Sequence, residues 1–128
     1  MPKLFSDNPS FPTRALQIWQ ILISKAANRQ TMTYGQLADM LGFGGAGTLA
    51  DMLGHIMFYC QQKKLPPLSA LVVNKDTGLP GLGLDINDLH AEREAVFKFD
   101  WYGIYPPTPE EFKQAFQTGM AAHKAKQP

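Results

Sequence analysis

Hydrophobic positions first recur at helical spacing over residues 13–27. Leu16, Trp19 and Ile23 fall on one face of a helix with 3.6 residues per turn, which predicts an amphipathic helix there. The preceding residues, 1–12, hold three prolines and are predicted to form an extended arm.

A second, short helix is predicted over residues 34–40. Thr33 and Gln36 have the spacing of a capping box, in which the hydroxyl and the amide satisfy the first free backbone donors of a helix. The glycine-rich segment 42–47 ends this helix, and apolar positions at helical spacing predict a third helix over residues 48–62.

A two-stranded β element is predicted next. Residues 70–74 are rich in β-branched side chains and indicate a strand, and residues 75–78 indicate a turn. Residues 79–84 are predicted to return as the second strand, although Pro80 and two glycines make it an irregular edge.

Two more helices complete the chain. Asp88 is a suitable N-cap for a helix over residues 89–99. Thr108 followed by Pro109 indicates the start of a last helix, predicted to fray after about Ala122.

The order of these elements predicts a mostly helical α+β fold, specifically a winged helix-turn-helix with a two-stranded wing and extra C-terminal helices. We expect an N-terminal arm over residues 1–12, a winged-helix domain over 13–105 and a C-terminal helix with a frayed tail over 106–128.

Composition supports one small domain. The chain has 128 residues, of which 45% are hydrophobic and 18% charged, as in ordinary globular proteins. The single Cys60 excludes an intramolecular disulfide, and three widely spaced histidines offer no local metal-ligand spacing, so we expect no metal and no cofactor. Without a long apolar run or a signal-peptide core, we expect a cytoplasmic protein with no membrane partner.

Charge is divided unevenly along the chain. Residues 14–75 carry six cations against two anions, whereas residues 76–112 carry two cations against eight anions. This asymmetry is compatible with one face that meets an anionic partner, and equally with two halves of a solvated surface.

Two segments resemble a known family: Thr33-Tyr34-Gly35-Gln36-Leu37-Ala38, and residues 71–78, which read Leu-Val-Val-Asn-Lys-Asp-Thr-Gly. They are similar to the C-terminal DNA-binding domain of alkylguanine-DNA alkyltransferases, and especially to alkyltransferase-like proteins. The resemblance covers about residues 15–99. It implies a winged-helix fold in which Tyr34 presses on a DNA phosphate; a tyrosine half-packed on the core is the alternative interpretation.

The resemblance also has departures. Ser69 falls on the position of the family's nucleophilic cysteine and Ala70 on that of its histidine. A serine hydroxyl without an adjacent base is not an activated nucleophile, so we expect no alkyl transfer and no enzymatic activity. Gly47 falls where the family inserts an arginine into the base stack, and Asp51 nearby would repel phosphates, which argues against flipping of a damaged base.

The leading interpretation is a non-enzymatic protein that binds double-stranded DNA through its basic half. The predicted DNA-contacting residues are Tyr34, Arg29, Thr48, Lys63, Lys64, Ser69 and Lys75. The alternative is a protein-interaction module of a DNA-processing or defence system that kept the fold. Its partner surface would be the acidic helix at 89–99 and the aromatic segment at 100–105.

Overall fold

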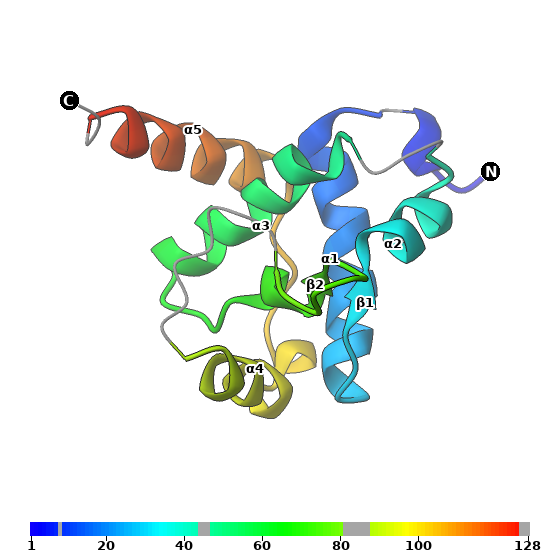
Figure 1. Ribbon diagram of the computed structural model, residues 1–128. Helices are drawn as coiled ribbons and strands as arrows, with labels where there is room; N and C mark the ends of the chain where they lie inside the picture. The colour runs from blue at the N-terminus through cyan, green and yellow to red at the C-terminus, as the bar shows by residue number, and fades with distance from the viewer. Residues whose placement is uncertain (8, 44–46, 81–87, 126–128) are drawn as a thin grey trace.

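The computed structural model describes residues 1–7, 9–43, 47–80 and 88–125 (Figure 1). Within these residues there are five α-helices and one two-stranded sheet, which confirms the predicted mostly helical α+β class. The helices are α1 (Phe11–Ala27), α2 (Tyr34–Leu41), α3 (Leu49–Gln62), α4 (Leu89–Lys98) and α5 (Pro109–Ala125). The strands are β1 (Met32–Thr33) and β2 (Val72–Val73), and short 3-10 helices occupy Phe5–Asp7, Leu68–Leu71 and Trp101–Gly103.

The N-terminal arm is shorter and less extended than predicted. The Ser10 hydroxyl accepts a hydrogen bond from the Thr13 backbone N–H, so α1 begins at Phe11 rather than at residue 13. Pro12 is tolerated in this first turn because the N–H it lacks has no partner within the helix there. Phe5–Asp7 form a turn of 3-10 helix, so the prediction of an extended chain was wrong for these residues.

The predicted helix caps are confirmed. The Thr33 hydroxyl accepts from the Gln36 N–H at 3.1 Å, and the Gln36 amide oxygen accepts from the Thr33 N–H at 3.0 Å. Thr108 and Glu111 make the same reciprocal pair at the start of α5. The Asp88 carboxylate accepts from the Ala91 N–H and begins α4. The last helix continues to Ala125, beyond the predicted fraying point at Ala122.

The sheet differs from the predicted wing. Residues 70–74 were predicted as a strand, but Ala70 and Leu71 belong to a 3-10 helix and only Val72–Val73 are extended. Their partner is β1, a strand that the sequence did not predict, and the pairing is parallel. Among the described residues, the predicted pairing of residues 70–74 with residues 79–84 is represented by one isolated antiparallel bridge, between Val73 and Pro80. The rest of the predicted second strand, residues 81–84, lies outside the described residues.

The core is centred on α1. The Trp19 ring is fully buried and makes edge-to-face contacts with Trp101 and Phe112, at centroid distances of 5.5 and 5.9 Å. Such aromatic pairs contribute about 0.5–1.5 kcal/mol each beyond the area they bury. Because Phe112 belongs to α5, the C-terminal helix is part of the same hydrophobic core as the rest of the chain.

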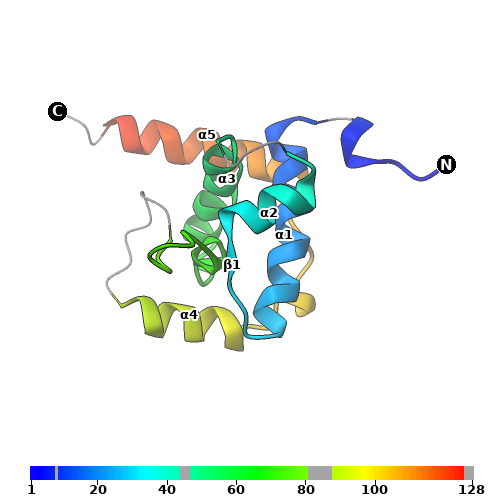
Figure 2. The same ribbon diagram turned by 45° about the vertical axis from the view of Figure 1, so that its right-hand side comes forward.

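Two views of the structure show how the helices are arranged around this core. Figures 1 and 2 both place α5 and α4 at opposite ends of the α1–α3 pair. Helix α2 and strand β1 lie beside α1, and β2 pairs with β1 and contacts α2. Outside the core, the chain is exposed at Gly47 and Thr48, just before α3, and at residues 74–79, just after β2.

Candidate nucleic-acid interface

The turn that carries Lys75 has a well-defined shape. The Asn74 side-chain oxygen accepts hydrogen bonds from the Asp76 and Thr77 N–H groups, at 2.8 and 3.3 Å. The backbone closes the turn through Asn74 N–H to Leu79 O and Gly78 N–H to Asn74 O, both 2.8 Å. Gly78 has a φ of 69°, a left-handed conformation that suits glycine. The predicted turn at residues 75–78 is therefore confirmed, and Lys75 is exposed at its tip.

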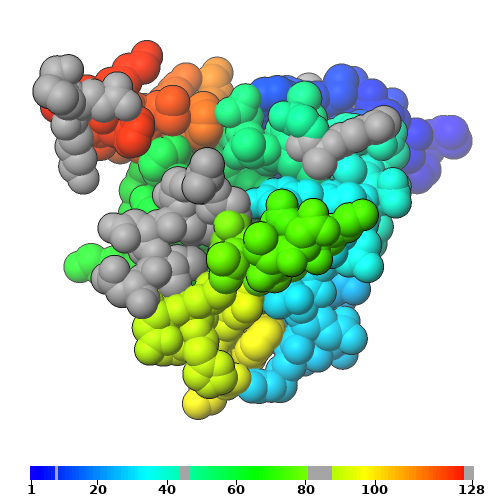
Figure 3. Space-filling model, viewed as in Figure 1, coloured from blue at the N-terminus to red at the C-terminus, as the bar shows by residue number. Residues whose placement is uncertain are grey.

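Three predicted DNA-contacting residues belong to segments that share one face. Tyr34 begins α2, Thr48 precedes α3, and Lys75 lies in the turn after β2. Figure 3 shows the turn after β2 in front of the start of α2, with the first turn of α3 above them. We call this the α2–α3–turn face. Tyr34 is half-buried in it, whereas Thr48 and Lys75 are exposed.

The N-terminus of α3 has hydrogen-bond donors that the helix does not use. Thr48 occupies the N-cap position, but its side chain makes no capping hydrogen bond. Adding a Cβ to the neighbouring Gly47 would meet no atom within 4 Å, so the surface there is open. The first turn also contains the exposed carboxylate of Asp51, and α3 contains no Lys or Arg.

Lys63 and Lys64 lie at the other end of α3. At a rise of ~1.5 Å per residue, they are separated from Thr48 by about 22 Å along the helix. Both side chains are exposed; the Lys63 ammonium lies 5.9 Å from the centroid of the Tyr59 ring. The structure therefore does not bring this pair together with the α2–α3–turn face.

Arg29 is engaged with α4. Its guanidinium forms an ion pair with Glu94 and lies 4.9 Å from the centroid of the Phe97 ring. A φ of 55° places its backbone in the left-handed region, directly after α1. Because its charge already has a carboxylate partner, Arg29 is the weakest of the predicted cationic phosphate contacts.

Ser69 is buried inside the molecule. Its side chain is 3% exposed, and its hydroxyl has no hydrogen-bond partner among the described residues. Since DNA cannot reach a side chain at this depth in the described conformation, Ser69 does not contribute to a surface contact. Cys60 of α3 is also buried, at 1% exposure, and burial raises the pKa of its thiol to about 12.

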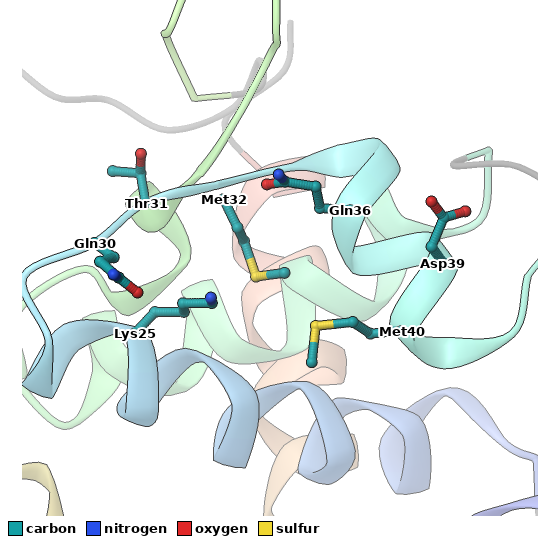
Figure 4. A pocket seen from close by; sticks show the side chains of 7 residues that line it. All are labelled: Lys25, Gln30, Thr31, Met32, Gln36, Asp39 and Met40. Carbon is teal, nitrogen blue, oxygen red and sulfur yellow. The ribbon is translucent and has the colours of Figure 1, made fainter.

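A groove that the sequence did not predict lies between α1, β1 and α2 (Figure 4). It has a volume of about 620 Å³. Its lining residues are Lys25, Gln30, Thr31, Met32, Gln36, Asp39 and Met40. The capping box at Thr33 was the only local sequence signal near this groove, and it predicted the start of a helix but not the strand before it.

Comparison with known proteins adds no relative: the chain matches no protein-family model, no curated protein and no solved structure. In the described part of the chain, no group of three or more His, Cys, Asp or Glu side chains could hold a metal ion. None of the helices described is long and apolar enough to cross a membrane.

Proposed function

We propose that the protein is a non-enzymatic, winged-helix DNA-binding protein, similar to the alkyltransferase-like proteins, that contacts duplex DNA through the α2–α3–turn face. The observation that carries this proposal is that Tyr34, Thr48 and Lys75, distant in sequence, belong to segments that meet on this face. A tyrosine and a threonine hydroxyl, a lysine and free N–H groups at a helix start are all typical phosphate ligands.

Binding of this kind would be dominated by the DNA backbone. The α3 helix offers no cation that could read guanine in the major groove, and Asp51 opposes close approach to phosphates. Lys63 and Lys64 extend the contact only if the duplex runs along α3, because they lie about 22 Å from its start. We therefore expect weak sequence preference and strong dependence on salt.

The proposal includes no alkyl-transfer step. The Ser69 hydroxyl lies next to Ala70, and no described side chain accepts its proton. Cys60 is protonated at neutral pH, because burial raises the pKa of its thiol to about 12, and a thiol in that state is a poor nucleophile.

The test is a fluorescence-anisotropy titration of a 20-base-pair duplex at several salt concentrations. Each phosphate contact contributes about −0.9 to the slope of log affinity against log salt, so Lys75→Ala should reduce the slope by about 0.9. The double variant with Lys63→Ala and Lys64→Ala should reduce this slope by about one or two if the duplex runs along α3. Tyr34→Phe should weaken binding less, because it removes one phosphate hydrogen bond.

Lys113→Ala, an exposed lysine of α5, is the matched control and should leave the slope unchanged. Absence of binding at low salt, or an equal effect of Lys75→Ala and Lys113→Ala, would refute the proposal.

One observation favours the protein-interaction alternative. In the aromatic segment after α4, Trp101 is buried, while Tyr102 and Tyr105 are 65% and 94% exposed. Exposed tyrosines held by a buried anchor are typical of protein interfaces. A photo-crosslinking side chain at position 105 should then give a discrete product in cell extract that the same group at position 124 does not give.

A further inference from the structure

Strand β1 has one edge that no other described strand pairs with. Among the described residues the sheet contains β1 and β2 only, so β1 has a strand neighbour on one side, with Met32 opposite Val72. The groove of Figure 4 is lined by residues of α1, β1 and α2 and by none of β2, so it runs along the other side of β1. An unpaired strand edge presents N–H and C=O groups that can pair with another chain.

The capping box shows which residue presents these groups. The Thr33 N–H donates to the side-chain oxygen of Gln36, a groove residue, and so points away from β2. Backbone groups of alternate residues point to the same edge of a strand. The N–H and C=O of Thr31 are therefore directed into the groove.

Side chains around this edge form an apolar floor between two opposite charges. Figure 4 shows the Met32 side chain pointing down from β1 toward α1, with Met40 of α2 beside it. Met40 is 57% exposed, and methionine adapts readily to different apolar ligands. Lys25 lies toward one end of the groove and Asp39 toward the other, and neither belongs to an ion pair among the described residues.

We infer that this groove binds an extended peptide segment of another protein, which adds as a strand beside Thr31. Peptide backbone groups would pair with Thr31, as in other cases of strand addition to a sheet edge. An apolar peptide side chain would rest on the exposed Met40, beside Met32, which is 3% exposed. An acidic residue would face Lys25 and a basic one Asp39. This inference does not rest on DNA binding, which uses other residues.

The test uses a synthetic capped peptide, Glu-Thr-Leu-Thr-Lys, titrated into ¹⁵N-labelled full-length protein. We expect amide chemical-shift changes concentrated at Gln30, Thr31 and Met32, and slower hydrogen exchange of the Thr31 amide. The matched control, Glu-Pro-Leu-Pro-Lys, keeps the charges and the leucine but lacks two of the backbone donors. It should bind much more weakly.

Protein variants test the side-chain contacts. Asp39→Lys should weaken binding of the first peptide by about two- to fivefold, the range for an exposed charge pair. Met40→Ser should weaken it as well. Asp76→Lys, which makes the same charge change in the exposed turn after β2, should have no effect.

Three outcomes would overturn the inference. Equal binding of the two peptides would exclude strand addition, and shift changes centred on α3 and α5 would place the site elsewhere. Shifts at Thr31 that depend on protein concentration without peptide would identify a second copy of the chain as the occupant.

Discussion

The phenyl ring of Phe116 in α5 stacks on the imidazole of His55 in α3, with ring centroids 4.1 Å apart and planes inclined by 5°. His55 is 4% exposed, and its Nδ1 lies 2.6 Å from the Asp51 carbonyl oxygen, so Nδ1 carries the proton and donates it. This stack joins the C-terminal helix to α3 through a titratable group.

Stability should therefore fall at mildly acidic pH. Burial lowers the pKa of His55, despite the opposing effects of the Asp51 carbonyl and carboxylate. Below the unfolded pKa of about 6.5, the unfolded chain takes up a proton that the folded chain resists, so unfolding becomes easier as pH falls. Urea unfolding at pH 8 and pH 5.5 should show a smaller loss of stability for His55→Leu than for the wild type. His90→Gln, at an exposed position, should keep the wild-type difference.

Gly119 should not tolerate a side chain. A Cβ at this position would overlap the Phe58 ring, because α5 and α3 approach closely there. Gly119→Ala should lower the free energy of unfolding by about 1–3 kcal/mol, the usual cost of overpacking. In α2, the nearest atom to a Cβ at Gly35 is 3.9 Å away. Gly35→Ala should raise stability by up to about 1 kcal/mol, since alanine is the better helix former. Equal effects of the two variants would contradict the close approach.

Phe112 should be essential to the core. Phe112→Ala removes a fully buried ring from the contact with Trp19 and should destabilise the protein by about 3–5 kcal/mol, measured by chemical unfolding. Tyr105→Ala, which replaces a 94% exposed aromatic, is the control and should change stability little. A small effect of Phe112→Ala would mean that α5 is an independent tail.

Cys60 should be inert in the folded protein. With its thiol pKa raised to about 12 and 1% exposure, it should react with iodoacetamide at pH 8 only as fast as the protein unfolds. Mass spectrometry should show one added group in urea and essentially none in buffer. Rapid labelling in buffer would show that the end of α3 opens easily.

The sequence predicted part of the candidate site. It identified Tyr34, Thr48 and Lys75 together with the elements that carry them. It also grouped with them Arg29, which is paired with Glu94, and Ser69, which is buried. Exposure and ion pairing depend on which distant segments pack together, so the spacing of residues along the chain does not predict them.

Sequence by itself determined the features that depend on neighbours within one or two turns. The capping pairs Thr33–Gln36 and Thr108–Glu111 join residues three apart, so they start α2 and α5 wherever the helices then pack. Only the tertiary structure decided the contacts between distant segments. The β1–β2 pair joins residues 32 and 72 through strands two residues long, and Arg29 meets Glu94 across 65 positions. Strands of two residues are too short to show an alternating pattern in the sequence. The edges of β1 and β2 meet only because the helices pack against α1.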